Sequence, residues 1–343
     1  MKLTSKYETI RRILSECKQP EYRFAQIMDA IFRQNIGEYE RMTILPKFLR
    51  DELNRVLGPN VCNIAPVKEL TSKQVSKVLF AIPGDEQVEA VRLTYERGWK
   101  SYCISTQCGC GFGCKFCATG TIGLKRNLTA DEITDQLLYF RLNGHSLDSI
   151  SFMGMGEALA NPHIFDAMAI LTDPSLFGLG HRRITISTIG LLPGIDKLTR
   201  EFPQVNLTFS LHSPFDDQRS ELMPINDRFP VRDVLMALDR HIRETGRKVY
   251  IAYILLRGVN DSTAHAEAVA ELLRGRGSWE HLYHVNLIPF NSTEVTPDSY
   301  RQSDPSGIKA FVRVLKSKGI SVTVRTQFGS DINAACGQLY RSE

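Results

Sequence analysis

The stretch YCISTQCGCGFGCKFCATG, residues 102–120, holds five of the chain's eight cysteines. Three of them follow the spacing Cys110-x3-Cys114-x2-Cys117. Thiolates bind iron–sulfur clusters, and three thiolates this close can hold three irons of a [4Fe–4S] cluster and leave the fourth iron open. Glycines at 109, 111 and 113 allow the loop to wrap closely around a cluster, because glycine accepts positive φ. The stretch therefore predicts an iron–sulfur site.

A zinc knot and an ordinary ferredoxin both fit the cysteine loop less well. A structural zinc site takes four ligands, typically from two separated cysteine pairs, whereas these cysteines lie together and the next histidine is His145. An ordinary ferredoxin would need a fourth cluster ligand and would not need the long chain that follows. Cys17, Cys62 and Cys108 are expected to be structural, since a lone cysteine usually packs as a small hydrophobe.

The composition indicates a folded protein of the reducing cytoplasm. The 343 residues are 43% hydrophobic, which suffices for a core, but no run of eighteen apolar residues and no signal peptide appears. We therefore expect no membrane contact and a cytoplasmic location, where cysteines stay reduced.

Positive charge is concentrated at the start of the chain. Residues 1–75 hold thirteen Lys/Arg against nine Asp/Glu, so the whole net charge of +4 lies there. This excess suggests a module that faces a polyanion, although a solvated helical surface is the simpler alternative.

Strands and helices alternate after residue 100. Short helices are expected over 8–75, for example in FAQIMDAIFRQ, followed by a hairpin at 76–95. In LTADEITDQLLYF, Thr129 and Glu132 form a capping box, and Gly246 and Gly319 follow two later helices as stop residues. Strands joined by helices predict parallel pairing through right-handed crossovers. The expected strands are 101–106, 148–153, 183–188, 205–211, 248–256, 282–288 and 321–326.

The sequence thus predicts an α/β protein with about six βα units, fewer than the eight of a closed barrel. The expected architecture is a partial (βα)6 barrel behind a small N-terminal helical domain and a short hairpin. The predicted divisions are a helical accessory domain at 1–75, a β-hairpin linker at 76–95, a core at 96–331, and a C-terminal segment at 332–343.

A C-x3-C-x2-C loop at the head of such an array resembles the radical S-adenosylmethionine (SAM) enzymes. The resemblance implies that the open iron binds the amino and carboxylate groups of SAM and that one electron releases a 5′-deoxyadenosyl radical. Polar residues near the carboxyl ends of four strands fit a cradle for SAM. Singly, each is more often a turn former, but together with the cysteines they favour a shared ligand. The expected SAM residues are Gly156, Glu157, Ser187, Ser210, Leu211, His212 and Asn291.

From about residue 20 to 340 the chain resembles one group within these enzymes, the RlmN/Cfr family, which methylates adenosine-2503 of 23S ribosomal RNA. The matching motifs include SFMGMGEALAN, SLHSP, LMPIND, VNLIPFN and DINAACGQL. RlmN methylates C2, and Cfr methylates C8 and confers antibiotic resistance. Ala158, Cys108 and the pair Gln327-Phe328 resemble the Cfr branch. Asn333 departs from the family, where an aspartate is common.

The resemblance implies a role for two further cysteines. C2 and C8 of adenine are electrophilic, so neither attacks a methyl donor, whereas a thiolate does. Cys336 would accept a methyl group from one SAM, and the radical from a second SAM would remove hydrogen from that methyl group. The carbon would then add to C8. Cys103 would attack the Cys336 sulfur to release the product, leaving a transient disulfide. Glu89 is implied as the proton acceptor.

The implied partners are 23S rRNA and an external electron donor such as a flavodoxin with its reductase, and we expect a monomer. The target base must leave its stack to react, and the N-terminal module resembles the family's RNA-binding accessory domain.

Two alternatives stay open: a C2-methylating RlmN-type housekeeping enzyme, and a non-catalytic iron–sulfur or RNA-binding protein. The second gives no reason for a SAM cradle or for paired distant thiols.

Overall fold

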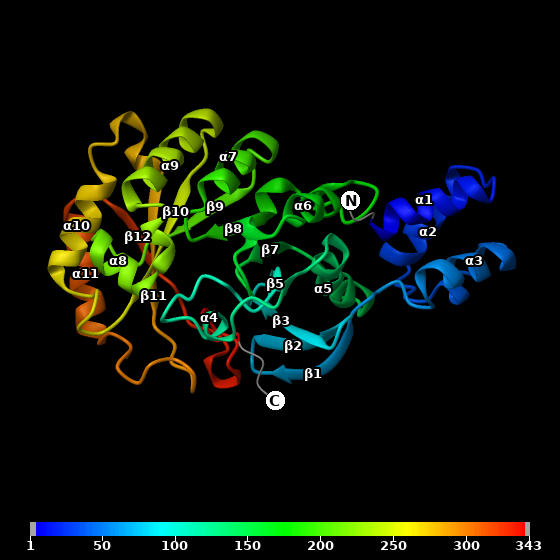
Figure 1. The fold of residues 1–343 in the computed structure, drawn as a ribbon, viewed down its shortest axis with the longest axis horizontal. Coiled ribbons are helices and arrows are strands. Elements are labelled where there is room, and N and C mark those ends of the chain that lie inside the picture. Colours follow the sequence, from blue (N-terminus) through cyan, green and yellow to red (C-terminus); the bar gives the residue numbers. More distant parts are fainter. Residues whose placement is uncertain (1–4, 340–343) are drawn as a thin grey trace.

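The computed structural model of the protein describes residues 5–339, and its centre is one sheet of ten strands (Figure 1). The strand order is β1-β2-β3-β4-β7-β8-β9-β10-β11-β12. Pairing is antiparallel from β1 to β4 and parallel from β4 to β12. The strands of the sheet are β1 Ala65–Thr71, β2 Val75–Ile82, β3 Glu86–Thr94, β4 Lys100–Cys103, β7 Ser149–Phe152, β8 Ile184–Thr188, β9 Asn206–Ser210, β10 Val249–Leu255, β11 Tyr283–Pro289 and β12 Ser321–Val324. A separate pair consists of β5 Gln107–Cys108 and β6 Arg126–Asn127.

Helices connect the parallel strands and cover the outside of the curved sheet (Figure 1). No helix among residues 5–339 is long and apolar enough to cross a membrane. The α-helices are α1 Lys6–Glu16, α2 Tyr22–Phe32, α3 Lys47–Leu57, α4 Ala118–Ile122, α5 Ala130–Leu142, α6 Ile164–Thr172, α7 Leu192–Glu201, α8 Asp216–Leu222, α9 Val231–Thr245, α10 Thr263–Leu273 and α11 Pro305–Ser317. Short 3-10 helices are η1 Tyr39–Arg41, η2 Ala158–Ala160, η3 His181–Arg183, η4 Pro224–Asp227, η5 Gly277–Leu282 and η6 Ser330–Ile332.

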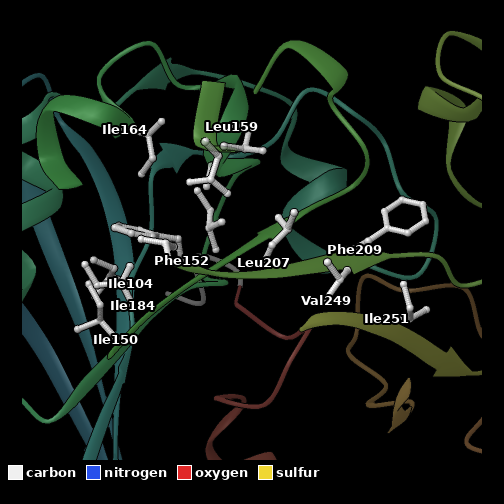
Figure 2. Packing of buried hydrophobic residues seen from close by; sticks show 14 of the residues in the cluster. Ile104, Ile150, Phe152, Leu159, Ile164, Ile184, Leu207, Phe209, Val249 and Ile251 are labelled. Carbon is white, nitrogen blue, oxygen red and sulfur yellow. The ribbon is translucent and has the colours of Figure 1, made fainter. Parts of the chain in front are cut away.

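Apolar strand residues form the main core between the sheet and its helices. Figure 2 shows Ile150, Phe152, Ile184, Leu207 and Ile251 within this core, and each is at most 2% exposed. Burying such side chains stabilises the fold by roughly 1.5–3 kcal/mol each. Parallel strands covered by helices in this way leave their polar residues at the strand ends, where a site can form.

The fold class predicted from the sequence is confirmed. The expected strands of the parallel array are present, with small differences at their ends. Thr129 and Glu132 form both hydrogen bonds of the predicted capping box, and Gly246 ends α9 with a φ of 64°. The first expected strand, 101–106, stops at Cys103. Further on, at Ser105, the side-chain amide of Gln136 takes the place of a neighbouring strand, because it accepts from the N–H and donates to the carbonyl oxygen of Ser105.

The prediction of helices throughout residues 8–75 is wrong for its last part. Helices end at Leu57, and Ala65–Thr71 forms β1, which pairs with β2. The strands at 75–82 and 86–94 are therefore part of the main sheet as well. Helices α1 to α3 pack around a hydrophobic cluster of their own, which touches the core through α5 and α6. The four divisions expected from the sequence stay a prediction.

The segment after β12 folds back against the antiparallel end of the sheet, so that the two ends of the curved sheet approach each other. Ser72 Oγ donates a hydrogen bond to Asp331 (2.7 Å), and Lys77 Nζ donates to the carbonyl oxygen of Asn333 (3.1 Å). Figure 1 shows this red segment beside α4 and the strands β1 to β3. Two further bonds, Ala118 N to Gly337 O and Thr119 Oγ1 to Leu339 O, attach it to the cysteine loop. These contacts bring Cys336 to the site.

Candidate active site

The three spaced cysteines line one cavity of about 180 Å³, which we call the cluster cavity. They lie in the loop between β5 and α4, and Cys117 is the residue that precedes α4. Gly109, with a φ of 73°, turns the loop, and a Cβ at this position would lie 1.8 Å from the carbonyl oxygen of Gly123. Glycine is therefore required for the close course of the loop.

The chemistry of the three thiols fits an iron–sulfur cluster. Burial, with a smaller effect from the neighbouring Cys117, raises the pKa of Cys110 to about 11. Burial also raises the pKa of Cys114, with added repulsion from Cys117 and Cys110. Bound iron would offset this repulsion, since it deprotonates a coordinating thiol. Within residues 5–339, no three Cys, His, Asp or Glu side chains are placed to share one metal ion. A cubane does not need that arrangement, because each thiolate binds a different iron.

Glu157 presents a buried carboxylate to the cluster cavity. It follows β7, and its two oxygens accept hydrogen bonds from the backbone N–H groups of Ile189 (3.0 Å) and Leu159 (3.3 Å). Burial raises its pKa to about 7, although these bonds oppose the shift. Gly156 has a φ of 97°, and a Cβ there would meet the side chain of Gln107 at 2.5 Å. A buried carboxylate with spare acceptor capacity suits a cationic ligand such as an ammonium group.

Three more of the predicted SAM residues, Ser187, Ser210 and His212, also line the cluster cavity. His212 has a φ of 59°, and its Nδ1 accepts a hydrogen bond from the N–H of Ile254 (2.9 Å). Burial lowers its pKa to about 3, so its imidazole is neutral. Leu211 is not among the lining residues, because its side chain is fully buried in the core.

A second cavity of about 360 Å³ contains the two outlying cysteines, Cys103 and Cys336, and we call it the thiol cavity. Asn291 lines this cavity and not the cluster cavity, and its side-chain amide donates to the backbone carbonyl of Cys336 (3.3 Å). The cavities adjoin, because four residues line both. These shared residues are Met153, Ile288, Arg325 and Cys336. Cys336 therefore stands at the boundary between the predicted cluster site and Cys103.

Burial and neighbouring groups shift the pKa values of both outlying thiols. Burial, with a smaller effect from the nearby Cys336, raises the pKa of Cys103 to about 12. Burial also raises the pKa of Cys336, but the guanidinium of Arg325 opposes that shift. Arg325 therefore favours the thiolate of Cys336, which is the nucleophilic form. Both cysteines are free thiols in the structure.

Glu89 is buried, at 1% exposed, and not solvated as a lone glutamate in a strand usually is. Its carboxylate forms an ion pair with Lys77 Nζ (2.8 Å), the same ammonium that bonds Asn333. Its neighbour two residues on, Val91, pairs with Cys103 and lines the thiol cavity. Glu89 thus lies on the cavity side of β3 but does not line either cavity, so its expected role stays a prediction.

Two arginines of the site were missed in the sequence. Arg325 follows the last residue of β12, so the strand-end rule that selected Ser210 could have found it. Arg219 is fully buried in α8 and donates hydrogen bonds to the backbone carbonyls of Ile189, Ser210 and Leu211 and to Asn226 Oδ1. Its acceptors are mostly backbone atoms, which carry no residue-specific signal in a sequence.

Comparison with known proteins assigns the chain to a family. Residues 104–273 match the Radical SAM superfamily. The chain is 61% identical over 335 residues to the ribosomal RNA large subunit methyltransferase Cfr of Lachnoclostridium phytofermentans, covering 98% of this chain and 97% of that protein. It is 58% identical over 336 residues to the protein of that name from Staphylococcus warneri, covering 98% and 96%.

A solved structure supports the same assignment. The crystal structure of a radical SAM methyltransferase from Sphaerobacter thermophilus superposes with a TM-score of 0.91 at 42% sequence identity, over 100% of both chains. The similarity therefore extends beyond the barrel to the N-terminal helices and the C-terminal segment. The protein is an enzyme that uses a [4Fe–4S] cluster and SAM. The chain belongs to the Cfr-like family of radical SAM rRNA methyltransferases.

Proposed function

We propose that the protein methylates C8 of adenosine-2503 in 23S rRNA through a methylated Cys336. The observation that supports this most is the position of Cys336, which lines both the cluster cavity and the thiol cavity. A carrier of a methyl group must meet its donor on one side and its acceptor on the other. The large-subunit rRNA named in the relatives supports the substrate.

The residues of the cluster cavity would hold the two cofactors. Cys110, Cys114 and Cys117 would ligate the cluster, and Glu157 would bind the ammonium group of SAM, with Gly156, Ser187, Ser210 and His212 around it. Leu211 would act indirectly, because its carbonyl oxygen accepts a hydrogen bond from Arg219 Nε and so fixes the backbone beside Ser210 and His212. Asn291 would act from the adjoining cavity. When bound, the cluster and SAM supply the methyl group and the one-electron chemistry.

Cys336 and Cys103 would act in sequence. The Cys336 thiolate, favoured by Arg325, attacks the methyl carbon of a sulfonium donor and forms a new carbon–sulfur bond as the donor's bond breaks. With the one-electron chemistry that the cluster and SAM would supply, the methyl group on Cys336 would lose one hydrogen atom, its carbon would join C8, and the adduct would give up one electron. As the C8 proton leaves, Cys103 Sγ attacks the sulfur of Cys336. That step breaks the sulfur–carbon bond, leaves its electron pair on the departing carbon, which takes up a proton, and forms a disulfide. An external reductant, such as a flavodoxin with its reductase, must then restore both thiols.

The target adenine would occupy the thiol cavity. A base must leave its stack to reach a reactive group that lines a cavity, and about 360 Å³ is within the range of ligand pockets. We propose Glu89 as the acceptor of the C8 proton. For that role its carboxylate must exchange its bond with Lys77 for one toward the cavity.

We further propose that the enzyme acts as a monomer in the cytoplasm. A methyl group on C8 of adenosine-2503 would confer resistance to antibiotics that bind the peptidyl-transferase centre.

Cysteine variants test this function. In anaerobically reconstituted protein, Cys336→Ala should abolish RNA methylation and keep full iron content, because Cys336 is not a cluster ligand. Cys103→Ala should accumulate a covalent RNA–protein adduct, since release needs the second thiol. Cys17→Ala, outside both cavities, is the control. Full activity of Cys336→Ala would refute the carrier role, and a C2 isomer in mass spectra of the product would reassign the enzyme to C2 methylation.

A further inference from the structure

A groove of about 670 Å³ continues from the thiol cavity to the surface. Tyr95, Thr326 and Phe328 line both, so the groove begins where the target base is proposed to sit. The rings of Tyr95 and Phe328 meet edge to face with centroids 6.1 Å apart. This contact joins the segment after β3 to the segment after β12, the place where the ends of the sheet approach each other.

Exposed aromatic rings form the outer part of the groove. Tyr95 is 40% exposed and Trp99 is 43% exposed, so both rings offer surface to a ligand in the groove. Both belong to the turn between β3 and β4, which is closed by hydrogen bonds from Tyr95 N to Trp99 O and from Gly98 N to Tyr95 O, each 2.8 Å. Trp99 Nε1 also donates to Ser149 Oγ (3.0 Å), which fixes the indole. The rings of Tyr95 and Trp99 are therefore held in position before any ligand binds.

Positive charge accompanies these rings. Arg97 lines the groove, and the guanidinium of Arg183 lies 5.6 Å from the centre of the Trp99 ring. Arg325 lies further in, at the thiol cavity. Glu96 is the one acidic side chain that lines the groove among the described residues. Fixed aromatic faces beside arginines are the features that bind unstacked bases and their phosphates in single-stranded nucleic acid.

We propose that this groove binds a nucleotide next to the target adenosine, with its base stacked on the Trp99 and Tyr95 side and its phosphate near Arg97. The inference rests on the proposed function, because it places the target adenine in the thiol cavity. Continuity with that cavity, a volume that suits one nucleotide, and the arginines favour RNA over an apolar partner. Such a contact would hold the RNA open while the target base enters.

The test uses the full-length, cluster-loaded protein and a hairpin RNA that carries the target adenosine, with 2-aminopurine at each flanking position in turn. Wild-type protein should quench the fluorescence of one flanking probe by stacking. Trp99→Ala should lose this quenching and weaken RNA binding roughly 5- to 100-fold. Trp99→Phe should retain most of the quenching and most of the RNA affinity, because it keeps an aromatic ring. The part that is lost would reflect the missing hydrogen bond to Ser149. Trp279→Ala, at an exposed tryptophan that does not line the groove, should behave as wild type.

Several outcomes would overturn the proposal. One is equal RNA affinity of Trp99→Ala and wild type, provided that iron content and thermal unfolding show both to be folded. Another is the absence of quenching by the wild type at either flank. Unchanged RNA binding with slower cluster reduction by a protein electron donor would assign the groove to that donor. Failure of the wild type to methylate the RNA at all would instead refute the proposed function.

Discussion

At the residue scale, the proposed role of Cys336 as a nucleophile depends on its neighbours. Burial favours the protonated thiol, and Arg325, which lines the same two cavities, opposes that effect. Methyl acceptance should therefore be sensitive to the charge at position 325, even though this residue is neither a cluster ligand nor a methyl carrier.

Arg325→Met should slow methylation of Cys336 by roughly tenfold at neutral pH, equivalent to about 1.4 kcal/mol of lost charge stabilisation. Raising the pH should restore much of the rate, because it deprotonates the thiol without help. The measurement is mass spectrometry of the methylated peptide during a time course. Arg325→Lys, which keeps the charge, should lose less. An Arg325→Met enzyme that loads at the wild-type rate would contradict this role for Arg325.

Single residues could be predicted where spacing alone carries the chemistry. The cysteine triplet is such a case, because its members lie within one loop and line one cavity. Glu157, Ser187, Ser210 and His212 were predicted from their places near strand ends, and the structure brings them to that cavity. Asn291 was selected by the same rule but lines the adjoining cavity, whereas Asn286 and Ile288 of the preceding strand β11 line the cluster cavity. The strand-end rule therefore does not say which of two adjoining cavities a residue lines.

At the scale of elements, Arg219 connects helix α8 to the ends of β8 and β9. Its guanidinium donates to the carbonyl oxygens of Ile189, Ser210 and Leu211, so it fixes the backbone around the predicted SAM residues. The helix also holds the cysteine loop, since Lys115 N donates to Leu222 O (3.0 Å). One buried side chain thus sets the spacing between the cluster loop and the SAM cradle.

Arg219→Lys should weaken SAM binding about tenfold, because an ammonium cannot satisfy the same set of carbonyl groups and each unsatisfied buried group costs roughly 1–3 kcal/mol. Equilibrium binding of SAM to reconstituted protein measures the effect, and iron content reports on the cluster loop separately. Arg232→Lys, at an exposed position of α9, is the matched control. If Arg219→Lys binds SAM as tightly as the control does, the backbone around SAM does not depend on this side chain.

Elements were predictable where their pattern was regular. The spacing of Thr129 and Glu132 predicts the capping box of α5. Runs of apolar residues predict the buried strands of the core. Strand β1 was missed because it is an edge strand with almost every residue exposed, so it shows no alternation of apolar and polar side chains. Its position is set by pairing with β2, a contact that no short sequence window contains.

At the scale of the whole molecule, buried histidines should make stability depend on pH. Burial lowers the pKa of His241 to about 4, with a smaller effect from Arg247, and the pKa of His212 is lowered to about 3. The folded state therefore binds a proton less readily than the unfolded state. This contribution to stability is complete above the unfolded pKa of about 6.5 and is lost as the pH falls toward the folded values.

The free energy of unfolding should fall below pH 6.5, by up to about 1.4 kcal/mol per pH unit for each of these histidines. His241→Phe should make this fall less steep, because it removes one of the two groups. Urea unfolding at a series of pH values measures the slope. His281→Phe, at an exposed position, should keep the wild-type slope. An unchanged slope in His241→Phe would show that this histidine does not contribute.

The place of Cys336 could not be derived from the sequence by physical reasoning, because long-range contacts determine it. The bond that anchors its segment, Lys77 to Asn333, joins residues 256 positions apart. Resemblance to a family implied a role for this cysteine, whereas its position next to both cavities depends on the curved sheet and on the contacts of its last segment with β2.

The position of the Cys336 sulfur between two cavities also has a consequence for the timing of the proposed reaction. Because Cys336 lines two adjoining cavities, the proposed methylation of its sulfur and the proposed transfer to a base can occur as separate events. A cell could therefore keep a stock of precharged enzyme that waits for newly made ribosomal RNA. The supply of sulfonium donor and the supply of transcript would then act on the protein at different moments.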